Sequence, residues 1–452
     1  MSIVILAAGQ GTRMRSDLPK VLQPLAGRPM LSHVVDCSRK LKPSDICVVY
    51  GHGGDTVPAA LDGQELRWAM QAEQMGTGHA VMQAMPEIPD GNCVLILFGD
   101  VPLTLPETLA RLIEVTGDAD MAILTVDMDD PTGYGRIVRS DGSVVRIVEQ
   151  KDASSTEQAI TEINTGVMLC PAGALKKWLD RLGNDNAQGE YYLTDVIAMA
   201  VTDGVDVHGV KATNQEEMMG INDKKQLAEA ERALQARLVG DLMTAGVGFA
   251  DPARVDIRGS LRCGKDVFID VNAVFEGDVD LGDGVVIESN NLIRDSRLGA
   301  GTVVHPNCHI ERSTTGANCE LGPFARLRPG VELANNVKVG NFVEIKNSNV
   351  ADGSKVNHLT YIGDTDIGTK VNVGAGTITC NYDGANKHRT RIGDGAFIGS
   401  GVNLIAPVEV GSGATIGAGS TITKPVPDDE LALERSKQTI VKGWKRPVKK
   451  GS

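Results

Sequence analysis

Two different spacings of apolar residues divide the chain. From residue 1 to about 220, short apolar runs alternate with segments whose apolar residues recur at helical intervals. The clearest strand candidates are residues 2–7, 46–50, 93–98 and 121–126. Because strands that alternate with helices form a mostly parallel sheet, this part predicts an α/β domain whose ligands bind beyond the carboxyl ends of the strands.

From about residue 251 to 424, aliphatic residues recur at every sixth position. The series are Ile392, Ile398, Leu404, Val410, Ile416 and Ile422; Leu321, Leu327, Leu333, Val339 and Ile345; and Ile257, Cys263, Ile269, Phe275, Leu281, Ile287 and Ile293. A period of six is typical of hexapeptide β-helices, in which each short strand places one aliphatic side chain inside the coil. The series break near residues 294–298, 346–350 and 379–391, where we expect loops to leave the coil.

A proline-free segment rich in Ala, Leu, Glu and Arg separates these two parts and predicts a helix that stops at Gly246. We therefore expect a first domain over residues 1–224 and a linker helix over 225–246. A β-helix domain with a C-terminal tail should follow over 247–452.

A glycine-rich turn lies directly behind the first predicted strand, in LAAGQGTRMRSDLPK. Gly9 and Gly11 lack a Cβ, so the backbone can approach an anion closely. Arg13 and Lys20 add two positive charges that suit a triphosphate. A tight turn with solvated Arg13 and Lys20 is the alternative.

The whole string resembles the sugar-nucleotide pyrophosphorylases, which join a sugar 1-phosphate to a nucleoside triphosphate and release pyrophosphate. Met14 stands where a dinucleotide fingerprint would carry its third glycine, which argues against a nicotinamide or flavin site. The resemblance implies a Rossmann-like nucleotidyltransferase domain in which Lys20 and Arg13 are catalytic. It also implies nucleotide contacts from Leu6, Ala7, Ala8, Gly9, Gly11, Arg13 and Lys20.

Asp100 ends the apolar run CVLILFGD, so its carboxylate should lie at the carboxyl edge of the sheet. Oxygen ligands of this kind suit Mg²⁺, although a surface-turn aspartate is the alternative. In the pyrophosphorylases the matching residue binds the metal, and Asn222 in GIND matches the second ligand. Phe98 departs from the family, whose members often carry Tyr there.

Two glutamines in MQAEQMGTGHA, Gln71 and Gln74, can donate and accept hydrogen bonds, as the edge of a pyrimidine requires. Glutamines on a helix surface are the alternative. The resemblance to uridylyltransferases implies that Gln71, Gly76 and Thr77 contact the nucleotide. It implies sugar contacts from Gly135, Glu149, Asn164, Tyr192 and Thr194.

His358, in VNHLTYIGD, is the candidate general base of the second domain. Histidine titrates near neutral pH and can accept a proton from an amine, although a structural histidine is the alternative. Arg328 and Lys346 supply charges that a sugar phosphate needs, and Lys387 could add a third from the segment that interrupts the hexads.

The repeat resembles the left-handed parallel β-helix of hexapeptide acyltransferases. The two parts together resemble a family of bacterial bifunctional N-acetylglucosamine-1-phosphate uridyltransferases and glucosamine-1-phosphate N-acetyltransferases. The resemblance implies that acetyl-CoA acetylates glucosamine 1-phosphate. UMP then passes from UTP to N-acetylglucosamine 1-phosphate, with Mg²⁺ as cofactor. The products would be pyrophosphate and UDP-N-acetylglucosamine for cell-envelope glycans, including peptidoglycan and lipopolysaccharide.

The same resemblance implies that His358 deprotonates the amine, with Asn381 nearby, and that a homotrimer completes each site. The implied sugar-phosphate residues are Arg328, Lys346, Tyr361, Asn372 and Lys387. The implied acetyl-CoA residues are Ala375, Asn381, Tyr382, Ser400, Ala418 and Arg435. A single-activity pyrophosphorylase with a β-helix scaffold and a non-catalytic relative are the alternatives.

Composition narrows the partners. A net charge of −13 disfavours general binding to nucleic acid or to an anionic membrane. Eight scattered cysteines without a C-x-x-C pair suit a reducing cytoplasm, and no apolar stretch is long enough to span a bilayer. We expect a cytoplasmic enzyme without membrane insertion. His305, Cys308 and His309 form a tempting metal cluster, but a fourth ligand has no obvious spacing.

Overall fold

The computed structural model describes residues 1–116 and 120–449. The chain divides into two compact units, Met1–Leu234 and Gln235–Ser452. Helix α8 (Lys224–Thr244) contributes residues to both units. Among the described residues, no helix combines the length and the apolar composition that crossing a membrane requires.

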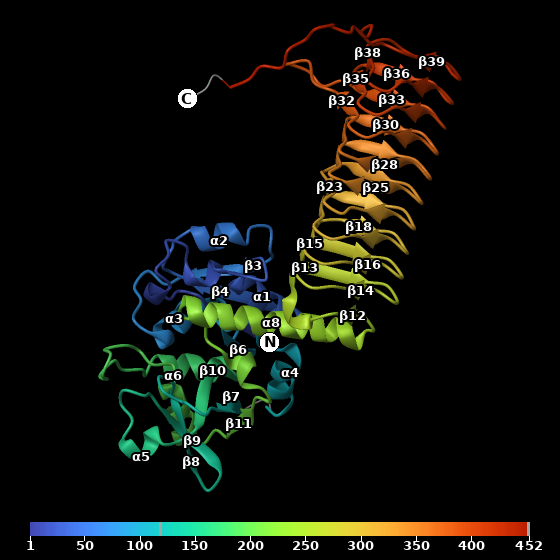
Figure 1. Cartoon of the computed structure of the whole chain (residues 1–452). Coiled ribbons are helices and arrows are strands. Elements are labelled where there is room, and N and C mark those ends of the chain that lie inside the picture. The colour runs from blue at the N-terminus through green and yellow to red at the C-terminus, as the bar shows by residue number, and fades with distance from the viewer. Residues whose placement is uncertain (117–119, 450–452) are drawn as a thin grey trace. The chain divides into compact units, whose positions relative to one another are not determined.

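The first unit is built on a sheet whose central order is β11-β7-β10-β6-β1-β4-β5 (Figure 1). β10 runs antiparallel to its neighbours β6 and β7, and the other pairs along this path are parallel, which confirms the predicted mostly parallel sheet. The strands are β1 (Ser2–Leu6), β4 (Asp45–Tyr50), β5 (Arg67–Met70), β6 (Cys93–Phe98), β7 (Met121–Asp127), β8 (Arg136–Ser140), β9 (Ser143–Val148), β10 (Glu162–Pro171) and β11 (Val207–Lys211). A small separate sheet joins β2 (Pro24–Leu25) and β3 (Arg28–Pro29).

Helices cover both faces of the large sheet. The helices before α8 are α1 (Met30–Lys40), α2 (Thr56–Ala60), α3 (Thr77–Ala84), α4 (Pro106–Glu114), α5 (Ser155–Gln158), α6 (Ala172–Leu179) and α7 (Asp195–Thr202), and all but α5 contribute buried residues to the core. Side chains alternate along β1, so Ile3 and Ile5 join the core with α1 and α4, whereas Val4 and Leu6 join the core with α3, α6 and α7. Burial on both faces explains why this strand is an unbroken apolar run.

The second unit is a solenoid of parallel strands, stacked coil upon coil (Figure 1). One sheet contains β12 (Gly248–Phe249), β14 (Phe268–Ile269), β16 (Val286–Ile287), β19 (Val303–Val304), β22 (Glu320–Leu321), β25 (Lys338–Asn341), β28 (Lys355–His358), β31 (Asn372–Val373), β34 (Phe397–Ile398), β37 (Thr415–Ile416) and β39 (Leu431–Ala432). The other contains β13 (Val255–Cys263), β15 (Ala273–Leu281), β17 (Leu292–Arg294), β18 (Arg297–Leu298), β20 (His309–Glu311), β21 (Ser313–Thr315), β23 (Arg326–Leu327), β24 (Val331–Leu333), β26 (Glu344–Lys346), β27 (Ser348–Val350), β29 (Tyr361–Gly363), β30 (Thr365–Ile367), β32 (Ile378–Cys380), β33 (Thr390–Ile392), β35 (Asn403–Ile405), β36 (Val408–Val410) and β38 (Thr421–Ile422). The hexad residues are buried inside the coil, apart from the half-buried Cys263.

Two of the three predicted loops are absent from the solenoid. Near residues 294–298 and 346–350 the chain turns a tight corner, with Asp295 and Asn347 in the left-handed conformation at φ of 45°. The register between coils there is 17 residues instead of the 18 seen at β13 and β15. Small polar residues tolerate this conformation, so the chain rounds the corner with one residue fewer. The prediction of loops at these two positions was therefore wrong.

The third break is a loop, as predicted. β33 pairs with β30 at a separation of 25 residues, and the extra residues lie between Cys380 and Thr390. An isolated bridge between Tyr382 and Lys387 closes this loop on itself.

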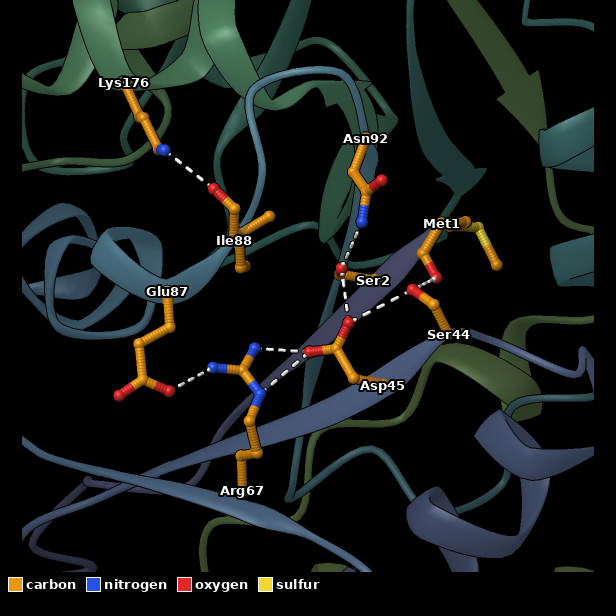
Figure 2. A network of polar contacts seen from close by, with 9 residues as sticks. All are labelled: Met1, Ser2, Ser44, Asp45, Arg67, Glu87, Ile88, Asn92 and Lys176. Carbon is orange, nitrogen blue, oxygen red and sulfur yellow. Dashed lines mark hydrogen bonds and ion pairs between the residues drawn. The ribbon is translucent and has the colours of Figure 1, made fainter.

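A polar network holds the amino-terminal edge of the first sheet (Figure 2). Arg67 forms ion pairs with Asp45 and with Glu87, the latter at 2.7 Å. Asp45 accepts a hydrogen bond from Ser2 Oγ at 2.5 Å, and Ser2 Oγ in turn accepts one from Asn92 at 2.9 Å. Burial alone would raise the pKa of Asp45, but the hydrogen bonds from Ser2 and Arg67 and the charge of Arg67 lower it.

Asp45→Asn should lower the melting temperature at pH 7 by about 2–4 °C, because charge-assisted hydrogen bonds of this kind contribute roughly 1–2 kcal/mol. Since the folded-state pKa of Asp45 is lowered, this stabilisation is present above its ordinary pKa and is lost as the pH falls through the lowered value. Calorimetry at several pH values measures the difference from the wild type. Asp62→Asn, at an exposed carboxylate, is the control. A difference that persists undiminished at the lowest pH would contradict the interpretation.

Candidate functional site

A cavity of about 400 Å³ lies at the carboxyl ends of the parallel strands of the first unit. We call it the strand-end cavity. β1 and β6 are parallel neighbours, with Leu6 opposite Phe98, so the turns that follow them open into the same space. Of the predicted nucleotide residues, those lining it are Leu6, Ala7, Ala8, Gly9, Lys20, Gln71, Gly76, Thr77 and Asp100. The structure also adds Gln10, Val21, Ala80 and Glu190, for which the sequence carried no signal.

The glycine-rich turn needs only one of its two glycines for its own packing. Gly11 has a φ of 61°, and a Cβ there would lie 2.6 Å from Lys20 Cβ. A Cβ on Gly9 would meet nothing within 4 Å, so the chain itself does not require a glycine there. Arg13 is exposed on a short 3₁₀ helix (Thr12–Met14) and does not line the strand-end cavity.

Lys20 is the charge centre of this cavity. Its ammonium forms an ion pair with Asp100 and donates a hydrogen bond to Asn222 Oδ1 at 3.1 Å. The side chains of Lys20 and Asp100 are only 12% and 18% exposed, so the surface-turn alternative for Asp100 is wrong. Ile221 N–H donates to the Asp100 carbonyl at 2.9 Å, which brings Asn222 to the same place. The carboxylate and amide oxygens converge on one cation and form the kind of hard oxygen donor set that Mg²⁺ prefers.

Gln71 and Gln74 do not lie on a helix. Gln71 follows β5, is 3% exposed and donates from Nε2 to the Gly76 carbonyl at 3.1 Å. Gln74 Nε2 donates to the Gln71 carbonyl at 3.4 Å. Gly76 has a φ of 106°, and a Cβ there would lie 2.7 Å from the Tyr191 carbonyl oxygen. The helix-surface alternative is therefore wrong.

A second cavity of about 210 Å³, the hairpin cavity, adjoins the first, because Thr77 and Phe98 line both. Of the predicted sugar residues, those lining it are Gly135, Glu149, Asn164 and Thr194. Thr194 Oγ1 donates to Glu149 at 3.1 Å, and burial raises the pKa of this carboxyl group. Tyr192 is not among the lining residues; its hydroxyl accepts a hydrogen bond from Gln188 at 2.9 Å.

In the second unit, His358 lies at the end of β28 and lines a cavity of about 270 Å³, the coil cavity. Its Nδ1 is 3.1 Å from Oδ1 of Asn341, the residue paired with it on β25. His305 lines the same cavity and contacts Glu288 at 3.1 Å. The sequence analysis did not identify Asn341. This residue lies 17 positions before His358, which is one coil length, and that separation could have identified it.

Positive charges gather on the neighbouring sheet. Lys346 contacts Lys387, and this contact together with burial and the charge of Arg328 lowers the pKa of Lys346. The register explains the meeting of Arg328 and Lys346, because the preceding residues Leu327 and Ile345 are paired. The inserted loop then brings Lys387 to them. A cluster of like charges indicates a binding site for an anion.

Asp364 completes this cluster and was also missed from the sequence. Burial alone would raise the pKa of Asp364, but the hydrogen bonds from Asn347 and Asn381 and the charges of Lys346 and Lys387 lower it. Asn381 is therefore held, buried, beside the cations. Tyr361 Oη and the Asn381 amide meet over Gly363, where a Cβ would collide with both. This arrangement brings Tyr361, Lys346 and Asn381 together around Gly363 and Asp364.

Four of the predicted acetyl-CoA residues, Ala375, Ser400, Ala418 and Arg435, follow one column of the coil. Gly401 N–H donates to the Ala375 carbonyl at 2.7 Å, and Gly419 N–H donates to the Ser400 carbonyl at 2.8 Å. Ala418 and Arg435 flank the same corner and are exposed, and a Cβ on Gly419 would lie 3.8 Å from Arg435 Cδ. The other two lie elsewhere: Asn381 is buried against Asp364, and Tyr382 is 60% exposed on the inserted loop. Asn372, predicted for the sugar phosphate, pairs with Lys355 on β28.

The suspected metal cluster near Cys308 is wrong. Within residues 1–116 and 120–449, no group of three or more His, Cys, Asp or Glu side chains is placed to hold a metal ion. Burial raises the pKa of Cys308 to about 11, so its thiolate is disfavoured. His305 contacts Glu288 instead.

Comparison with known proteins agrees with both units. Residues 3–164 match the MobA-like NTP transferase domain, and residues 389–424 match six repeats of the bacterial transferase hexapeptide, whose solenoid is the left-handed β-helix expected above. A solved structure described as a putative glucose-1-phosphate thymidylyltransferase from Bacillus anthracis covers 52% of this chain and 94% of its own, with 20% identity. Its TM-score of 0.42 is too low to support an argument.

Relatives named "Bifunctional protein GlmU" match the whole chain. The one from Azoarcus sp. (strain BH72) is 58% identical over 99% of this chain and 100% of its own length. Those from Janthinobacterium sp. (strain Marseille) and Nitrosospira multiformis are 57% and 55% identical, and each match spans at least 98% of both chains. The chain therefore belongs to the GlmU family of bifunctional enzymes, which unite an N-acetylglucosamine-1-phosphate uridyltransferase and a glucosamine-1-phosphate N-acetyltransferase in one polypeptide.

Proposed function

We propose that this protein acetylates glucosamine 1-phosphate at the solenoid and then transfers UMP to the product at the strand-end cavity, using separate residues for each step. The observation that carries this proposal is that each unit holds its own cation centre, Lys20 in the first and Lys346 with Lys387 in the second. Glucosamine 1-phosphate and N-acetylglucosamine 1-phosphate both carry a phosphate group, so each site needs local positive charge on a chain whose net charge is −13.

For uridylyl transfer, UTP occupies the strand-end cavity and the sugar phosphate the hairpin cavity. The two cavities meet at Thr77 and Phe98, which sets the sugar phosphate beside the α-phosphorus of UTP. Lys20 neutralises the charge that develops on the transferring phosphate, while Gln71 and Gly76 contact the uracil. Arg13 lies outside the cavity lining, so its role requires that the exposed 3₁₀ turn close over the triphosphate.

Asp100 and Asn222 are the residues that would hold Mg²⁺. When bound there, the ion supplies further charge neutralisation on the phosphates. Lys20 now lies between these two oxygens, so it must turn toward the phosphates when both oxygens take up the ion.

For acetyl transfer, Arg328, Lys346 and Lys387 bind the phosphate of glucosamine 1-phosphate, and Tyr361 and Asn381 orient the sugar. His358 accepts the amine proton as the nitrogen attacks the thioester of acetyl-CoA. Coenzyme A lies along the column of Ala375, Ser400 and Ala418, whose small side chains leave the corner open.

We further propose a homotrimer in the cytoplasm, with subunit contacts next to His358. Phe324 and Phe342 stack at 5.2 Å and are 49% and 56% exposed, and Leu359, directly after His358, is 63% exposed. All three have positive φ, between 50° and 56°, which costs a bulky residue about 1–2 kcal/mol each. Strained apolar residues exposed beside a site support burial against a second copy of the chain.

Lys20→Ala should lower the rate of uridylyl transfer by about 10²–10³-fold, because it removes the charge nearest the transferring phosphate. Acetyl transfer should be unchanged, since its residues belong to the other unit. Assaying each step with its own sugar phosphate measures both rates, and Lys42→Ala, at an exposed lysine, is the control. Loss of acetyl transfer in a folded Lys20→Ala protein would contradict the division of the two reactions.

The KM for glucosamine 1-phosphate should depend on the protonation of Lys346. Because its pKa is lowered by Lys387 and burial, KM should rise at a lower pH than an ordinary lysine would impose. Lys387→Met should move this rise to higher pH. Lys346→Met should raise KM about tenfold, and KM should then no longer rise with pH. Lys370→Met is the control. Identical pH profiles for the wild type and Lys387→Met would contradict the shared phosphate site.

Phe342→Asn should dissociate the trimer and slow acetyl transfer at low protein concentration. The subunit itself should not become less stable, because Asn tolerates a positive φ. Sedimentation velocity measures the assembly, and Phe268→Asn, at a Phe that is 42% exposed elsewhere on the coil, is the control. A monomeric wild type that transfers acetyl groups at full rate would contradict the proposed assembly.

A further inference from the structure

The side chain of Asn341 contacts that of His358, and none of the roles proposed above uses this contact. Asn341 Oδ1 lies 3.1 Å from His358 Nδ1. The two residues are register partners on parallel strands, Asn341 at the end of β25 and His358 at the end of β28. Side chains paired in this way leave the sheet side by side, so the contact follows from the fold.

The backbone on both sides of this contact is fixed. Leu359 N–H donates to the Asn341 carbonyl at 3.1 Å. The His358 carbonyl accepts from Thr360 Oγ1 at 2.6 Å and from Gly376 N–H at 3.2 Å. With the main chain held, the orientation of the imidazole is the freedom that remains, and Asn341 is placed to restrict it.

An amide oxygen can only accept, so it pairs with Nδ1 when that nitrogen carries the proton. The lone pair of a neutral imidazole is then on Nε2. The opposite amide orientation would put an N–H group against Nδ1 and the proton on Nε2, where it could not accept one from an amine. General base catalysis by His358 therefore requires the orientation in which Asn341 presents its oxygen.

We propose that Asn341 is the positioning residue of the acetyltransferase, holding neutral His358 with its proton on Nδ1 and its lone pair on Nε2. This inference rests on the proposed role of His358. As the amine nitrogen bonds to the acetyl carbon, its proton passes to Nε2. The carbon–sulfur bond then breaks, and the departing coenzyme A sulfur takes that proton, which returns His358 to its starting form.

The charged groups around the coil cavity do not replace Asn341. His305 contacts Glu288 at 3.1 Å, and Lys338 forms an ion pair with Glu320 at 2.7 Å. Each of these groups has its own partner among the described residues. A neutral amide also adds no charge beside the imidazole, whereas a carboxylate there would favour the imidazolium form, which cannot accept a proton.

The test compares substitutions of Asn341 with His358→Gln in the full-length protein. His358→Gln should abolish acetyl transfer; if it does not, the proposed function of His358 fails, whatever Asn341 does. Asn341→Leu, which has a similar size but no acceptor, should lower kcat about 10- to 100-fold with little change in KM for either substrate.

Asn341→Asp keeps the acceptor and should restore most of the activity. Its carboxylate would stabilise the imidazolium, so the acidic limb of the kcat/KM profile should move to higher pH. Asn349→Leu is the matched control, because the Asn349 side chain also reaches a residue one coil further on, donating from Nδ2 to Asp366 at 2.8 Å, but does not contact His358. If Asn341→Leu does not fold, the pH profile of kcat/KM for Asn341→Asp still tests whether Asn341 positions His358.

A measurement independent of turnover is the ¹⁵N NMR spectrum of the His358 ring. The wild type should show a protonated Nδ1 at pH 8, and Asn341→Leu should lose that preference while Asn349→Leu retains it. An unchanged kcat and an unchanged tautomer in Asn341→Leu, with His358→Gln inactive, would overturn the proposal. An acidic limb that does not move in Asn341→Asp would also overturn it.

Discussion

Parallel backbone pairing is the constraint on which both sites depend. Once β1 lies beside β6, Leu6 is opposite Phe98, and the turns that follow them must open at the same edge of the sheet. In the solenoid the same pairing recurs at 17 or 18 residues over most of the coils and sets Asn341 beside His358. Each site is therefore an assembly of residues that the strand ladders, not the side chains, bring together.

Positive charge is handled differently in the two units. Lys20 is paired with Asp100 and Asn222, so its charge is already satisfied in the free enzyme. Lys346 lies against Lys387 with Arg328 nearby. Asp364 and Glu344, which forms an ion pair with Arg328 at 2.8 Å, balance only part of that charge. The second site thus holds repulsion that a bound phosphate relieves, whereas the first must exchange one set of partners for another as substrate and metal ion bind.

Several of the residues in or beside the proposed acetyltransferase site lie at corners of the coil. Asn347 rounds a shortened corner and also helps to hold Asp364, which in turn fixes Asn381. Phe342 and Leu359 round other corners in a conformation that bulky residues avoid, directly after Asn341 and His358. The β-helix gives each of these residues a rigid place, and the single inserted loop adds Lys387 to the set.

The sequence by itself determined the two folds, because a period of six and the alternation of strands with helices are local patterns of apolar residues. It also determined the chemistry of the turns at Gly11 and Asp100, since strand ends are visible in the chain. It did not distinguish a shortened corner from a loop at residues 294–298 and 346–350, because both interrupt the hexads in the same way. Only the tertiary structure decided that Lys20 bridges Asp100 and Asn222 and that Asn341 touches His358. These contacts join residues 80, 202 and 17 positions apart, and no local pattern reports which side chains a ladder of backbone hydrogen bonds will bring within reach.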